Sequence, residues 1–226
     1  MGSEGANFSQ RARDAGAASA IARSTADRNA AKLVRLRDGS SVTVRAARAQ
    51  DEPALLVFLS RLCLEARRMR FFTGAADIEY AAHLVAATGG DRYGLIAHDE
   101  EGVTVGHATY AKLDDRCAEV AIEVADHLHG RGLGTLLIER LAAVAEAEGI
   151  TRFVAEVLPE NRAMLDVFRD GFDARVCFHD GSDTAEFPTA AWRLGRERFE
   201  QTPSRRLWKA PDGGALSTAA AVPRAS

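Results

Sequence analysis

A glycine-rich segment at residues 129–134 constrains the fold more than any other part of this sequence. It follows a stretch, Cys117 to Val124, whose apolar residues alternate as in a strand, and it precedes a run with helical apolar periodicity that stops at Gly149. A turn from strand to helix directs several backbone N–H groups, and the positive end of the helix dipole, toward one space. Because glycines let the backbone approach a ligand closely, the segment predicts an anion-binding turn.

The spacing of the glycines disfavours two common nucleotide sites. A P-loop needs a Lys-Ser or Lys-Thr pair after its glycines, and these glycines have none, so ATP and GTP are disfavoured. A dinucleotide fingerprint counted from Gly130 and Gly132 needs a glycine where Thr135 stands. The preceding segments are predicted as successive strands rather than a βαβ unit, which disfavours NAD as well. A glycine-rich turn that only starts a helix is the alternative interpretation.

The composition is typical of a soluble globular protein with one domain. The chain has 226 residues, of which 46% are hydrophobic and 27% charged, and its net charge of −3 argues against a broad basic surface for nucleic acid. There is no run of about 18 apolar residues to span a membrane, and the first residues lack the apolar core of a secretory signal. Cys63, Cys117 and Cys177 form no CxxC pair, so we expect a cytoplasmic protein without a metal site.

The chain divides into a folded unit and two tails. Residues 1–31 and 199–226 are rich in small and polar residues, so we expect a flexible N-terminal arm and a flexible C-terminal tail around one domain at residues 32–198. A hairpin is predicted at Asp38–Gly39, followed later by an antiparallel meander of three strands. The predicted strands cover residues 42–44, 93–98, 103–112, 117–124, 151–157, 174–178 and 185–194, and the predicted helices 51–62, 77–87, 133–148 and 161–169. This order is α+β with one strand-helix-strand crossover.

The glycine-rich segment, His129-Gly130-Arg131-Gly132-Leu133-Gly134, resembles the acyl-CoA-binding motif of the GCN5-related N-acetyltransferases (GNAT). That motif has Gln or Arg, two residues, Gly, any residue, and then Gly or Ala, so His129 is the departure. Asn161 and the pair Gly171–Phe172 match two further family positions. The resemblance implies a single GNAT-type domain, in which helices flank a mixed central sheet.

Three further segments resemble one subgroup of this family, the bacterial Pat-type protein lysine acetyltransferases. The segments Arg35–Arg45, Asp51–Leu55 and Arg67–Phe72 are similar to that group. The resemblance implies acetyl-CoA as the cofactor and a protein substrate such as an acyl-CoA synthetase. The implied cofactor-binding residues are Val124, Ala125, His129, Gly130, Arg131, Gly132, Leu133, Gly134, Thr135 and Asn161.

Acetyl transfer to an amine needs a base, because a free lysine with a pKa of about 10.4 is protonated at neutral pH. Glu119 and Glu123 lie four residues apart on the strand before the glycine turn, so both point to one face of a regular strand. Apolar neighbours raise the pKa of such a carboxyl group toward the range of a general base. Glu119 also stands where Pat-like enzymes carry their base. We predict Glu119 first and Glu123 second, and an exposed charge is the plainer interpretation for Glu123.

The other parts of the reaction have weaker signals in the sequence. A backbone N–H near Val124 or Ala125 is expected to meet the oxyanion. Val167 stands four residues before Gly171, where many family members have a tyrosine that protonates the leaving thiolate. The thiolate is therefore expected to leave without a side-chain acid, or with a proton from water.

Several alternatives stay open. Arg67, Arg68 and Arg70 are expected on a solvated face, or as a basic rim for the cofactor's 3′-phosphate or an acidic partner. Cys117 and Cys177 are expected to be small buried hydrophobic residues. The rival functions are a small-molecule amine N-acetyltransferase and a non-catalytic acyl-CoA-binding regulatory module. DNA binding by the arginine-containing arm is disfavoured by the negative net charge.

Overall fold

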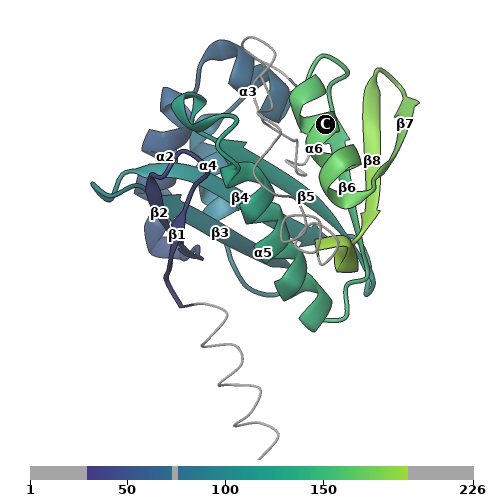
Figure 1. The fold of residues 1–226 in the computed structure, drawn as a ribbon, viewed down its shortest axis with the longest axis horizontal. Coiled ribbons are helices and arrows are strands. Elements are labelled where there is room, and N and C mark those ends of the chain that lie inside the picture. The colour runs from purple at the N-terminus through teal and green to yellow at the C-terminus, as the bar shows by residue number, and fades with distance from the viewer. Residues whose placement is uncertain (1–29, 73–75, 193–226) are drawn as a thin grey trace, which may run out of the picture.

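The computed structural model describes residues 30–72 and 76–192, and within them an eight-stranded sheet forms the centre of the molecule (Figure 1). The strands lie in the order β1-β2-β3-β4-β5-β6-β8-β7, and the β5–β6 pair is parallel while the others are antiparallel. The strands are β1 (Lys32–Arg35), β2 (Ser41–Ala46), β3 (Arg92–His98), β4 (Thr104–Lys112), β5 (Cys117–Val124), β6 (Arg152–Val157), β7 (Arg175–His179) and β8 (Ser182–Pro188). The predicted hairpin, meander and crossover are confirmed, as is the α+β class.

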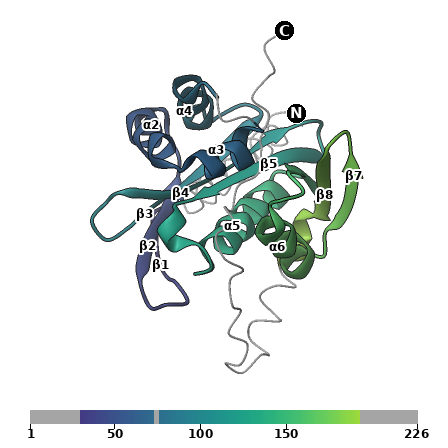
Figure 2. The same cartoon turned by 90° about the horizontal axis from the view of Figure 1, so that it is seen from above.

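Helices cover both faces of this sheet (Figure 2). On one face lie α2 (Glu52–Arg61), α3 (Leu64–Phe71) and α4 (Ile78–Ala86), and on the other lie α5 (Leu133–Ala147) and α6 (Arg162–Phe172). Each face has its own buried apolar cluster, one under α2, α3 and α4 and a larger one under α5 and α6. The predicted arm and tail lie outside the described residues, apart from Ala30 and Ala31.

The two parallel strands separate soon after they begin to pair. β5 and β6 are in register only from Cys117 opposite Arg152 to Glu119 opposite Val154, although both strands continue beyond these residues. The β5–α5 connection with its glycines lies at the diverging end of β5. The sheet is therefore open between β5 and β6 beside the glycine turn, while β4 continues to pair with β5 on the other side as far as Val124.

The structure differs from the sequence-based expectations in three elements of the fold and in the burial of one cysteine. Helix α3 was not predicted. Helix α6 extends past Gly171, because Phe172 is buried and packs on Phe187, and Asp173 ends the helix in the left-handed conformation. Strand β8 ends at Pro188 and a 3-10 turn follows, so the strand predicted to residue 194 is too long. Cys177 is exposed because β7 is an edge strand with a largely exposed surface, whereas Cys117 is buried as expected.

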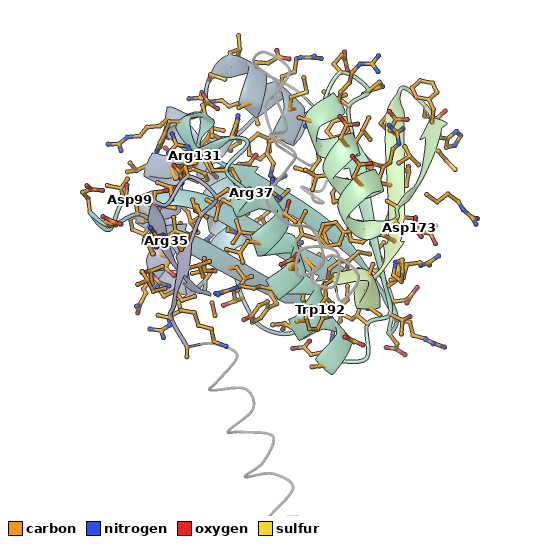
Figure 3. The ribbon with its side chains drawn as sticks, in the orientation of Figure 1. Arg35, Arg37, Asp99, Arg131, Asp173 and Trp192 are labelled. Atoms are coloured by element: carbon orange, nitrogen blue, oxygen red, sulfur yellow. The ribbon has the colours of Figure 1, made fainter. Side chains whose placement is uncertain are left out.

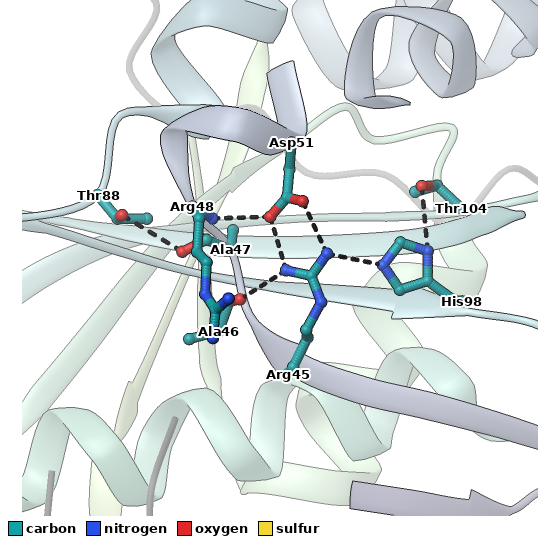
Figure 4. Close-up of polar contacts among 8 residues, drawn as sticks. All are labelled: Arg45, Ala46, Ala47, Arg48, Asp51, Thr88, His98 and Thr104. Carbon is teal, nitrogen blue, oxygen red and sulfur yellow. Dashed lines mark hydrogen bonds and ion pairs between the residues drawn. The ribbon is translucent and has the colours of Figure 1, made fainter. Parts of the chain in front are cut away.

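A hydrogen-bonded ion pair ties the start of α2 to strand β2 of the sheet (Figure 4). Arg45 on β2 donates from Nη1 and Nη2 to the two carboxylate oxygens of Asp51, at 2.6 and 2.7 Å. The Arg48 backbone N–H also donates to Asp51, and the Arg45 guanidinium lies 3.2 Å from Nε2 of His98 on β3. The hydrogen bonds from Arg45 hold the pKa of Asp51 below its ordinary value.

We expect Asp51→Asn to lower the free energy of unfolding by about 2 kcal/mol at pH 7, because charged hydrogen bonds are lost at a nearly buried group. Because the pKa of Asp51 is lower in the folded state, its charge stabilises the folded protein at pH values above the unfolded pKa of about 3.9. That stabilisation is lost as the pH falls through the folded pKa. The difference between wild type and variant in urea unfolding should therefore shrink below about pH 4. The exposed Asp115→Asn is the control, and a difference that stays constant from pH 6 to pH 2 would contradict this role.

Candidate active site

The glycine turn gives α5 an N-terminus without a side-chain cap. Gly132 is the N-cap residue, at φ 90°, and Gly130 is also left-handed, at φ 73°. Both conformations favour glycine. The first turn of α5 carries no acidic residue, so its N–H groups and the positive end of the helix dipole face outward without a carboxylate from this helix. Such a terminus is suited to bind phosphate oxygens.

The β1–β2 turn brings Arg37 to this helix terminus, where Arg131 of the glycine turn also lies (Figure 3). The Arg37 backbone N–H donates to the Arg131 carbonyl at 3.2 Å, and a β-carbon on Gly132 would lie 3.2 Å from Nε of Arg37. The Arg131 guanidinium forms an ion pair with Asp38. Asp38 offsets the charge of Arg131, and Arg37 places a second guanidinium near the positive pole of the helix. Sequence reasoning did not find Arg37, because only the folded hairpin places it beside the turn.

The backbone of β5 offers hydrogen-bonding groups to the open side of the sheet. The Ala125 N–H donates to the Val105 carbonyl at 2.8 Å, so it is already used within the sheet. Because hydrogen bonding alternates along an antiparallel pair, Val124 directs its N–H and carbonyl away from β4, toward the opening. The Val124 carbonyl lies 2.9 Å from Nε2 of His129, which therefore donates to it. Of the two expected oxyanion donors, the geometry favours Val124.

The two glutamates of β5 share a face, as expected, but their surroundings differ. Glu119 is partly exposed and lies at the last β5–β6 pair, where the strands separate. Glu123 is 1% exposed, and its Oε2 lies 2.6 Å from Nε of Arg70 on α3. The expectation that Glu123 is a solvated charge is wrong, because α3 covers it. Glu119 is accordingly the more exposed of the two carboxylates.

The arginines of α3 have partners in and beside that helix. Arg70 is buried against Glu123, so its expected place on a solvated face is wrong. Arg67 donates to the carbonyls of Leu62 and Ser60. Arg68 pairs with Glu65 and Glu160 at 3.5 and 3.4 Å. Two other cations, Arg37 and Arg131, lie beside the glycine turn, and a basic rim formed by Arg67 and Arg68 stays a prediction.

Two further predicted positions lie on the other side of the opening, at α6. Asn161 is fully buried, and its side-chain oxygen accepts the Met164 N–H at 3.2 Å as the N-cap of α6. Val167 is partly buried and packs against the apolar cluster under α5 and α6.

Residues 30–72 and 76–192 hold no cluster of three or more His, Cys, Asp and Glu able to bind a metal ion. None of the helices in that part of the chain is long and apolar enough to cross a membrane.

Comparisons with known proteins agree on one family. Residues 61–172 match the acetyltransferase (GNAT) family. The crystal structure of the GNAT domain of S. lividans PAT is 33% identical, with a TM-score of 0.64, and the match covers 70% of this chain and 96% of that domain. Acetyltransferase Pat from Mycolicibacterium smegmatis is 35% identical over 88 residues, which is 39% of this chain and 25% of that protein. Acetyltransferase PA5475 from Pseudomonas aeruginosa is 28% identical over 144 residues, 58% of this chain and 74% of that protein.

The chain spans only a quarter of the mycobacterial Pat protein, so the likeness concerns the acetyltransferase domain. An uncapped helix terminus flanked by cations, beside an opened sheet with a carboxylate at its edge, is consistent with acyl transfer from an anionic cofactor. The chain therefore belongs to the GCN5-related N-acetyltransferase (GNAT) family of acetyltransferases.

Proposed function

We propose that the chain transfers an acetyl group from acetyl-CoA to a lysine side chain of another protein, such as an acyl-CoA synthetase. The 33% identity to the S. lividans PAT domain, across 96% of its length, is the observation that supports a protein lysine as the acceptor. We place the catalytic unit at residues 32–198. A small amine is the alternative acceptor, because neither the fold nor the cofactor specifies which amine is used.

The residues around α5 fit the phosphate groups of coenzyme A. The N–H groups of Leu133, Gly134 and Thr135 would bind them, with Gly130 and Gly132 allowing the close approach. Arg37 and Arg131 would add positive charge, and Asn161 would contact the pantetheine end. Acetyl-CoA, when bound, supplies an acyl group already activated as a thioester.

Glu119 serves as the general base in this proposal. It accepts a proton from the lysine ammonium group, which frees the nitrogen lone pair to attack the thioester carbonyl and form the new N–C bond. The Val124 N–H donates to the acetyl carbonyl oxygen as negative charge develops on it. Val167 offers no proton for the departing thiolate, so water supplies it. Glu123 is engaged by Arg70 and takes no part in proton transfer.

The experiment that tests the acceptor class follows radiolabel from acetyl-CoA into two separate pools. The full chain is incubated with [14C]acetyl-CoA and either desalted lysate protein or a metabolite fraction, and the purified chain is titrated with acetyl-CoA in parallel. We expect label in protein, stable to hydroxylamine as an amide is. Label only in small molecules would favour the amine acetyltransferase, and binding without transfer would favour a regulatory module.

A further inference from the structure

The half of β5 that lines the opening loses its pairing with β6 beyond Glu119. A strand hydrogen-bonded along one edge is held less firmly than a central strand, yet Val124 in this half is the proposed oxyanion donor. Its position therefore depends on side-chain contacts. On one side, Nε2 of His129 lies 2.9 Å from the Val124 carbonyl. On the other, Glu123 is held from α3 by Arg70.

The Arg70–Glu123 pair is almost completely enclosed. Nε of Arg70 lies 2.6 Å from Oε2 of Glu123, and the two side chains are 2% and 1% exposed. His107 on β4 is directly opposite Glu123 and is fully buried. Burial, and then the positive charge of Arg70, lower the pKa of His107 to about 3, so His107 is neutral at pH 7. Arg70 and Glu123 are thus the charged members of this cluster.

The cluster is not arranged for maximal stability. Within the described residues, Nη1 of Arg70 is buried without a hydrogen-bond partner. An incompletely bonded polar group in the interior is unfavourable, and well-packed apolar side chains commonly replace a buried ion pair without loss of stability. Buried polar groups without complete hydrogen bonding are expected at positions where function requires them. This one lies next to the proposed oxyanion donor.

We infer that Arg70 is a positioning residue, which acts through Glu123 to hold the β5 backbone so that the Val124 N–H meets the acetyl carbonyl oxygen. The inference rests on the proposed function. Arg70 comes from α3, so the packing of this helix against β5 is coupled to the geometry of the oxyanion donor. Misplacing a reacting group by about 1 Å costs on the order of 100-fold in rate.

The test removes both charges together, because loss of one member would leave an unpaired buried charge and risk unfolding. Arg70→Met/Glu123→Leu is compared with Arg68→Met/Glu160→Leu, which removes a more exposed ion pair between the same helix and the turn before α6. Rates are measured where circular dichroism shows both variants fully folded. We expect the first variant to lose about 30- to 100-fold in kcat with an unchanged Kd for acetyl-CoA, and the control to keep wild-type values.

A spectroscopic measurement separates positioning from a merely structural role. The infrared carbonyl band of bound [13C]acetyl-CoA moves to lower frequency when the oxygen accepts a hydrogen bond. We expect the shift in wild type and in the control, and its loss in Arg70→Met/Glu123→Leu. A wild-type kcat and an unchanged band in that variant would overturn the inference. Failure of the wild-type chain to bind or transfer acetyl groups would instead overturn the proposed function.

Discussion

Glu119→Gln should lower kcat by about 10² to 10⁴-fold while leaving the Kd for acetyl-CoA within about twofold, because a general base contributes that much and Gln keeps the shape of the side chain. The loss should diminish at high pH, since more of the lysine is already unprotonated as the pH approaches about 10.4. Steady-state kinetics from pH 6 to 10 and calorimetric titration with acetyl-CoA make the measurement.

The control for this variant is Glu101→Gln, an exposed glutamate in the turn before β4. It should match wild type at every pH. A Glu119→Gln variant with wild-type kcat at neutral pH would remove Glu119 as the base. A Gln variant that is slow at every pH by the same factor would indicate a role in binding the acceptor rather than in accepting its proton.

Gly132→Ala should weaken acetyl-CoA binding by about 100-fold, which corresponds to about 2.7 kcal/mol. Gly132 has φ 90°, and a β-carbon there would lie 3.2 Å from Nε of Arg37, within the space faced by the first turn of α5. The new methyl group thus meets the side chain that the hairpin places at the proposed phosphate site. Calorimetric titration with coenzyme A and with acetyl-CoA measures the loss.

Gly149→Ala is the matched control for backbone strain. Gly149 has nearly the same conformation, φ 86°, but nothing lies within 4 Å of an added β-carbon. Both variants should lose about 1 to 2 kcal/mol in free energy of unfolding, from the left-handed conformation alone. If Gly149→Ala weakens acetyl-CoA binding as much as Gly132→Ala does, the effect is one of stability and the proposed phosphate site is wrong.

Helix α3 shows why part of the site could not be read from the sequence. Its inward residues are Ala66, Met69 and Arg70, so the segment lacks the apolar stripe by which amphipathic helices are recognised. An arginine normally indicates a solvated position, and only the carboxylate of Glu123, 53 residues further along the chain, makes its burial tolerable. The burial of Glu123 could not be predicted for the same reason, because it depends on Arg70, which is distant in the sequence.

The glycine turn, the meander before it and the shared face of Glu119 and Glu123 follow from local patterns, because turn geometry and strand alternation depend on neighbouring residues. The sequence by itself therefore determined the type of fold and the position of the glycine turn. The tertiary structure alone decided that Arg37 lies against this turn, that Val124 rather than Ala125 faces the opening, and that Arg70 engages Glu123. Each of these depends on pairing between segments far apart in the chain, and local periodicity carries no information about such pairing.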